Sequence, residues 1–174
     1  LTIYSHYLTD VFFEEYYKHQ KLFTQYELKK LFSVMTNETR DRLITSFSLL
    51  SREAQYAAID LLGNMRGYNS VNILRSLLNH PDSEIRVKTL KAMYELKVFI
   101  DLKQIEPFTR SAVWQERLMT AKLLENVALN KVTDIYTRLI QDDNWWVRHE
   151  AARVLSLTKE GRQTLERIGK EAEA

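Results

Sequence analysis

Arg148-His149-Glu150-Ala151-Ala152-Arg153-Val154-Leu155 is the last of four stretches that align along the chain at a constant interval of 31 residues. The three earlier stretches are Gln55–Leu62, Arg86–Met93 and Arg117–Leu124. Small or apolar residues recur in most of the same columns, and arginine fills the first column in three of the four stretches. A constant period in this range is the sequence signature of a helical solenoid. Such folds present long curved surfaces to other macromolecules and seldom enclose a catalytic pocket.

The spacing of apolar residues predicts an all-α fold. Leu74, Leu77 and Leu78 show the intervals of three and four that are typical of helices. We therefore expect each unit to consist of a leading helix, a short turn and a second helix. Pro107 is expected to lie inside a leading helix and to bend it. The segment from Gly63 to Gly67 is expected to connect two units.

The turns contain residues that favour the start of a helix. Ser51, Asp82 or Ser83, and Asn144 lie where the second helix of a unit needs an N-cap. Their side-chain oxygens would accept hydrogen bonds from the first free backbone N–H groups of the helix.

The stretch from Leu139 to Leu155, LIQDDNWWVRHEAARVL, resembles the HEAT-repeat pattern almost throughout, and Leu77 to Met93 is a looser copy. The resemblance covers residues 38 to 158 and is weakest at Ser111–Leu118, where the turn aspartate is missing. It implies a right-handed α-α superhelix of about five helical hairpins that serves as a protein-binding scaffold. In repeats of this type the column arginine pairs with a turn aspartate of the adjacent unit, which implies a structural role for the residues Arg86, Arg117 and Arg148, with Asp82 and Asp142 or Asp143 as acceptors.

The expected organisation has three parts. Residues 1–36 hold nine of the 19 aromatic residues and are expected to form an aromatic-rich N-terminal helical cap or degenerate repeat; the alternative is an exposed docking or membrane-proximal surface. Residues 37–158 form four HEAT-like repeats. Residues 159–174 form a C-terminal helix or the start of a further repeat.

Composition limits the function classes. The formal net charge of +2 disfavours a nucleic-acid partner, which usually requires a strongly basic surface. The absence of cysteine excludes disulfides and thiolate chemistry and fits a cytoplasmic location. Because the chain starts at Leu1, we expect a piece of a longer protein. It could be the soluble portion of a membrane-anchored protein whose membrane segment is missing from this chain.

A column of cations is the first candidate for partner binding. Asp60 is followed at the same column by Lys91, Lys122 and Arg153, and Lys88 lies close to this column. If the second helices line a concave face, these residues would form a basic groove for a protein partner with an acidic surface or segment. The alternative interpretation is a solvated surface that is diluted by Glu95, Glu125 and Glu150.

Tryptophans are the second candidate. Trp114 and Trp145 share a column in adjacent repeats, so packing between repeats is the expected use for both. Trp146 has no counterpart one repeat earlier and is the better candidate for an exposed anchor, although burial is equally compatible with the sequence.

The pair His149-Glu150 resembles the iron-binding pairs of helical-repeat deoxyhypusine hydroxylases. One pair cannot hold a metal, because a metal needs several converging ligands, and the matching columns contain no other ligand pair. We expect a solvent-facing pair, no metal, no cofactor and no catalytic residue.

The first hypothesis for the function is therefore a non-enzymatic HEAT-like scaffold. The alternative is a DNA-binding protein similar to HEAT-like alkylpurine DNA glycosylases, with Trp145 or Trp146 near Asp142 or Asp143.

Overall fold

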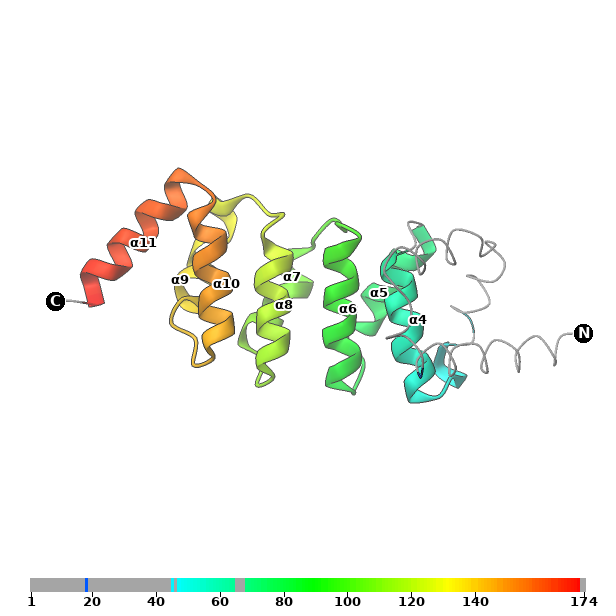
Figure 1. Cartoon of the computed structure of the whole chain (residues 1–174). Coiled ribbons are helices and arrows are strands. Elements are labelled where there is room, and N and C mark those ends of the chain that lie inside the picture. The colour runs from blue at the N-terminus through cyan, green and yellow to red at the C-terminus, as the bar shows by residue number, and fades with distance from the viewer. Residues whose placement is uncertain (1–17, 19–44, 46, 65–67, 173–174) are drawn as a thin grey trace, which may run out of the picture. The chain divides into compact units, whose positions relative to one another are not determined.

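The structure of the chain is a computed structural model that describes residues 18, 45, 47–64 and 68–172 (Figure 1). Over these residues it contains eight α-helices and short 3-10 turns and no strand, which confirms the predicted all-α fold. The cap or degenerate repeat predicted for residues 1–36 lies outside the described residues, except for Lys18. The chain divides into two compact units, residues 1–96 and 97–174.

Unit 1 is built around two parallel-lying second helices. Its described elements are η2 (Phe47–Leu49), α4 (Arg52–Asn64), α5 (Tyr68–Leu77) and α6 (Ser83–Glu95). Figure 1 shows α4 beside α6 with α5 behind them, and all three helices pack against one another. The side chains of Ile59, Leu62, Leu74, Ile85 and Leu90 are fully buried between these helices. Their burial is the main stabilising contribution in this unit.

A glycine allows α4 and α6 to approach closely. The predicted connection from Gly63 to Gly67 is wrong at its start, because α4 continues to Asn64 and includes Gly63. A Cβ atom at Gly63 would lie 2.9 Å from Cβ of Ala92 on α6. Gly63 therefore belongs to a helix contact and not to a loop, since only glycine leaves room for Ala92 there. Residues 65–67 lie outside the described residues.

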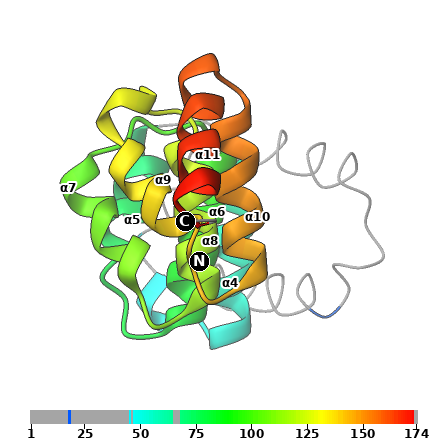
Figure 2. The same ribbon diagram turned by 90° about the vertical axis from the view of Figure 1, so that its left-hand side faces the viewer.

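Unit 2 repeats the same arrangement. It contains α7 (Leu102–Ile105), η3 (Glu106–Arg110), α8 (Trp114–Leu124), η4 (Leu129–Lys131), α9 (Thr133–Leu139), α10 (Trp145–Ser156) and α11 (Lys159–Ala172). Within this unit α7 and α9 lie on one side, and α8 and α10 lie on the other (Figure 2). α10 packs against α8, α9 and α11, so it is the central helix of the unit.

The predicted bend at Pro107 takes the form of a change in helix type. α7 ends at Ile105, and the chain continues as the 3-10 helix η3 with Pro107 in its first turn. Proline has no N–H group and its ring excludes the carbonyl four residues earlier, so an α-helix cannot continue through it.

The second helices of both units start at regular positions. α4, α6, α8 and α10 begin at Arg52, Ser83, Trp114 and Trp145, which are 31 residues apart. Asp82 and Asn144 cap α6 and α10 as predicted, because their side-chain oxygens accept hydrogen bonds from Glu84 N and Trp146 N. None of the helices in the described part of the chain combines the length and apolarity required to cross a membrane.

Candidate interaction surface

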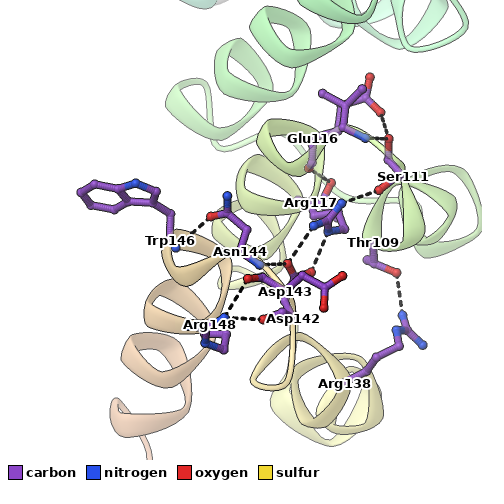
Figure 3. A network of polar contacts seen from close by, with 12 residues as sticks. Thr109, Ser111, Glu116, Arg117, Arg138, Asp142, Asp143, Asn144, Trp146 and Arg148 are labelled. Atoms are coloured by element: carbon purple, nitrogen blue, oxygen red, sulfur yellow. Dashed lines mark hydrogen bonds and ion pairs between the residues drawn. The ribbon is translucent and has the colours of Figure 1, made fainter.

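A hydrogen-bonded turn fixes the start of α10 in unit 2 (Figure 3). Arg117 on α8 donates from Nε to Oδ2 of Asp142 at 2.6 Å and from Nη2 to Oδ1 at 2.8 Å. Its third donor, Nη1, reaches the carbonyl oxygen of Ser111 at 2.7 Å. This fork-to-fork geometry is the strong form of an arginine–carboxylate pair. The pairing of Arg117 with a turn aspartate, which the family resemblance implies, is thereby confirmed.

Asp142 is held as a carboxylate inside this turn. Its side chain is only 7% exposed, and it also accepts a hydrogen bond from the backbone N–H of Asn144. Burial raises the pKa of Asp142, but the hydrogen bonds from Arg117 and Asn144 and the positive charges of Arg117 and Arg148 together outweigh it. The pKa therefore lies below its usual value. The turn is thus stabilised by a charge that persists at neutral pH.

The other column arginines bond mainly within their own turns. Arg86 donates to the carbonyl oxygens of His80 and Pro81, and Arg148 donates to those of Asp142 and Asp143. Asp82, predicted as an acceptor for this column, instead accepts from Arg52, which lies outside it. The turn that lacks an aspartate is completed by Ser111, which donates to the buried carboxylate of Glu116 and accepts from Val113 N.

The predicted basic column is largely neutralised by neighbouring carboxylates. In unit 1, Lys88 pairs with Asp60 at 3.0 Å, and the more exposed Lys91 lies 3.8 Å from Glu95. Carboxylates on the same surface therefore supply counter-charge to both lysines, and Glu95 is one of the residues expected to dilute the column. The role of both lysines in partner binding stays a prediction.

In unit 2 the same column contains Lys122 and Arg153. Arg153 bonds to Glu125 at 2.6 Å and to Glu150 at 2.7 Å, and these two carboxylates hold its pKa above the usual value. Lys122 is half-buried and forms no ion pair with any residue that the structure describes. Arg153 thus serves in a three-residue cluster and presents little free charge to a partner.

The expectation that His149 and Glu150 form a solvent-facing pair is wrong for Glu150. The Glu150 side chain is buried because Arg153, one turn later on α10, accompanies it as a counter-ion. His149 is exposed and stacks on Trp145 with ring centroids 5.0 Å apart. In the part of the chain that the structure describes, no group of three or more acidic, histidine or cysteine side chains is arranged to hold a metal.

Two adjacent tryptophans form the largest exposed aromatic feature of unit 2. Trp145 is 54% exposed and Trp146 is 56% exposed, and their rings meet edge to face with centroids 4.7 Å apart. Together with His149 they form a surface that we name the aromatic patch. Asn144 caps the helix at the same point by accepting a hydrogen bond from the backbone N–H of Trp146, so Trp146 lies directly beside the hydrogen-bonded turn (Figure 3).

The expected packing between repeats is wrong for Trp145, which is 54% exposed. Trp114 is half-buried, but over the residues described here it forms no ring contact with Trp145. Position 145 is the first residue of α10, and the ring there extends toward Trp146 and His149 on its own helix. Trp146 is exposed, which resolves the alternative that its sequence left open.

A cavity that the sequence did not predict lies at one end of unit 2. It has a volume of about 420 Å³ and is lined by residues that follow α6 and α8, including Lys97, Phe99 and Lys131. No motif marks it, because it is formed by two loops that are distant in sequence. The one local signal is the run Val98-Phe99-Ile100, an apolar stretch outside any repeat column.

The described residues thus define an all-helical protein with paired helices, a turn fixed by ion pairs and an exposed aromatic patch. No family model matches the sequence, and no curated protein matches it. Among solved structures, the chain is similar to an engineered protein of known crystal structure. The two are 19% identical with a TM-score of 0.46, over 82% of this chain and 68% of that chain. At this identity and TM-score nothing about function follows.

Proposed function

We propose that the chain is a non-enzymatic HEAT-like scaffold that binds a protein partner. In this proposal the helix pairs stack as a right-handed α-α superhelix of about five hairpins, and the aromatic patch is the principal anchor. The observation that carries the proposal is the exposure of Trp145 and Trp146 beside a turn that is held by the hydrogen bonds of Arg117 and Asn144.

The regular spacing of the helices supports a repeat architecture. Second helices begin every 31 residues, and each described leading segment precedes its second helix by a short turn. The Arg117–Asp142 pair matches the contact that the resemblance to HEAT repeats implies. Repeats of this kind stack because each one alone cannot bury its apolar face.

The aromatic patch supports a binding role for energetic reasons. Large aromatic side chains that are more than half exposed are unusual on a surface that binds nothing. Tryptophan is enriched among the residues that dominate interface energies, where truncation typically costs at least about 2 kcal/mol. A rigid helix start presents both rings without a large ordering cost on binding.

The charged residues support a non-enzymatic role. Asp142, Glu150 and Arg153 are each held in ion pairs that stabilise the fold. Of the five predicted contact residues, Lys88, Lys91, Lys122, Arg153 and Trp146, we place Trp146 first, because it is 56% exposed and three of the four cations have carboxylate partners.

No specific observation favours the alternative of a DNA-binding or alkylpurine DNA glycosylase-like protein. That function would need an acidic group near the tryptophans; Asp142 is paired with Arg117, which leaves the exposed Asp143 as the remaining candidate. It would also need a dense set of cations for phosphates, whereas Lys88, Lys91 and Arg153 in or beside the predicted column have carboxylate partners. For the location we propose the cytoplasm, or the soluble portion of a membrane-anchored protein, because a chain without cysteine fits a reducing compartment.

The binding proposal is tested by capture followed by titration with the purified partner. Proteins retained by the immobilised wild-type chain are identified, produced separately and titrated against wild type, the double variant W145A/W146A and the control L157A. Leu157 lies just past the other end of α10 and is 54% exposed, so its truncation removes exposed apolar surface outside the aromatic patch. We expect the double variant to weaken binding by at least about 30-fold and the control by less than about twofold. Equal binding by all three proteins would reject the aromatic patch as the anchor.

The architectural part is tested by small-angle X-ray scattering. A compact domain of this length would have a radius of gyration of about 16 Å. A stacked array of helix pairs is elongated and must give a clearly larger value for the monomer. A monomer at the compact value would contradict the superhelix while leaving the binding proposal to its own test.

A further inference from the structure

Unit 2 contains a cavity that is separate from the aromatic patch. One wall consists of the segment Lys97–Ile100 that precedes α7, and the other consists of the loop after α8 and the turn η4. Its volume of about 420 Å³ lies within the range of small-ligand pockets, so it has room for one or two side chains of a bound segment. None of the five contact residues predicted from the sequence lines it.

The apolar wall is formed by an extended segment with alternating burial. Val98 and Ile100 are 7% and 8% exposed, whereas Phe99 between them is 84% exposed. Lys97 has a φ of 53°, a left-handed conformation that is uncommon for any residue but glycine. This backbone conformation directs the chain away from the preceding helix and starts the segment that lines the cavity.

The charge of the lining has one sign. Lys97 and Lys131 are the charged residues that line the cavity, both are exposed, and no carboxylate lines it. Within the described ranges neither lysine forms an ion pair, in contrast to Lys88, Lys91 and Arg153. Asn126 adds an amide that can donate and accept hydrogen bonds.

We propose that this cavity binds an acidic peptide segment with one apolar anchor residue, contributed by the protein partner. This inference rests on the proposed scaffold function and moves the acidic-partner site from the basic column to the cavity. Carboxylates of the segment would pair with Lys97 and Lys131, and its apolar side chain would lie against Val98, Phe99 and Val127. Charge complementarity selects the segment and accelerates its association, while the apolar contact supplies affinity.

The test uses synthetic peptides as defined probes. Fluorescein-labelled peptides that carry Asp or Glu on both sides of a single Leu or Phe are titrated by fluorescence anisotropy. Matched peptides replace the acids by Asn or Gln, or replace the apolar residue by Ser. The proteins are wild type, K97E/K131E and the control K103E/K159E, which makes the same change of net charge at two exposed lysines outside the cavity.

We expect the acidic apolar peptides to bind wild type and the control variant alike. K97E/K131E should weaken this binding at least about tenfold, and the difference should shrink as salt screens the charges. Amide chemical shifts of the labelled wild-type chain should change at residues 97–102 and 126–131. Absence of binding, equal binding to K97E/K131E, or shifts confined to other residues would each overturn the proposal. Binding of a simple carboxylate such as octanoate, without binding of any of the peptides, would overturn the proposal in favour of a small-molecule site.

The failure of this inference is distinguishable from the failure of the scaffold proposal. If W145A/W146A abolishes binding of the purified partner and K97E/K131E does not, the scaffold proposal stands and the cavity is not part of the interface. If no purified partner binds the wild-type chain, the scaffold proposal fails, and the peptide titration still decides whether the cavity binds acidic segments.

Discussion

The turn that holds the aromatic patch is expected to depend on the Arg117–Asp142 pair, and a double-mutant cycle measures that dependence. The variants are R117A, D142N and the combined R117A/D142N. The Arg117 side chain is 15% exposed and that of Asp142 is 7% exposed, so the two charges are largely shielded from water. R117K serves as an additional variant, because lysine keeps the charge but cannot form the two-pronged contact.

The magnitude follows from the contacts that are lost. R117A removes both bonds to Asp142 and the bond to the Ser111 carbonyl, and it leaves the carboxylate with the Asn144 N–H as a partner. Removal of one partner from a buried pair costs about 3–5 kcal/mol, and the residual exposure of Arg117 reduces this to about 3 kcal/mol. We expect a coupling energy of about 2 kcal/mol between the two positions and a loss of about 2 kcal/mol for R117K.

The assay is urea-induced unfolding at neutral pH, followed by circular dichroism. A second cycle at Arg167 and Glu171 is the matched control. These residues form an exposed pair on α11 at 3.4 Å, with side chains 59% and 64% exposed. Such an i,i+4 pair should show a coupling of about 0.5 kcal/mol or less.

A coupling at Arg117 and Asp142 no larger than that of the control would refute the reasoning. It would mean that the turn holds its geometry without the ion pair, through the Asn144 cap and the bonds of Arg148 alone. An R117K variant as stable as wild type would refute the narrower claim that the fork geometry matters, and not the charge alone.

Three further predictions concern stability and exposure. Gly63→Ala should destabilise the protein by about 1–2 kcal/mol, because the added Cβ would lie 2.9 Å from Cβ of Ala92. Gly169→Ala is the matched control: the added Cβ would have no atom within 4 Å, so it should stabilise the protein by about 0.5–1 kcal/mol in the same urea assay. The stability difference between wild type and D142N should be constant above about pH 5 and should decrease as the pH falls below about 4. The reason is that a carboxyl whose pKa is lowered by folding stabilises the folded state above its unfolded-state pKa and loses that contribution when it is protonated. A stability difference that grows in acid would contradict the direction of the pKa shift. W145F/W146F should remove most of the tryptophan fluorescence that acrylamide quenches, since both rings are more than half exposed, and it should lower the free energy of unfolding by less than about 1 kcal/mol. Strong acrylamide quenching of the remaining Trp114 fluorescence would contradict the assignment of Trp145 and Trp146 as the exposed tryptophans.

Much of the local structure could be predicted because it depends on residues close in sequence. The caps at Asp82 and Asn144 follow from the preference of Asp and Asn side chains for the free N–H groups of a helix start. The change of helix type at Pro107 follows from its missing N–H group. α8 was less predictable, because Val113 at its N-cap provides no side-chain acceptor and Ser111 completes the turn instead.

The candidate site was less predictable because exposure depends on packing. The sequence placed Trp114 and Trp145 in one column, and equal columns suggested equal environments. In the structure Trp114 is half-buried and Trp145 is exposed, although each is the first residue of its helix, so the exposure of these rings is not determined by their repeat position. The cavity beside Lys97 and Lys131 could not be inferred at all, because its two walls come from loops outside the repeating columns.

The ion pairs of the predicted column form between residues at a fixed interval in the sequence that differs from the repeat length. A column compares residues that are one repeat apart. A long side chain on one second helix, however, also contacts the neighbouring second helix, at a position one helical turn away from the equivalent residue. Lys88 and Asp60 are 28 residues apart, and so are Arg153 and Glu125. This interval is one repeat less one helical turn, and it recurs independently in each unit. A lysine or arginine on a second helix should therefore be judged by the residue 28 positions earlier before it is assigned to a partner. The residue 28 positions before Lys91 is Gly63, so by that criterion Lys91 has no counter-ion on the neighbouring helix. It pairs instead with Glu95 on its own helix, at the long distance of 3.8 Å. It is the cation of the predicted column in unit 1 that an acidic partner would most readily take over.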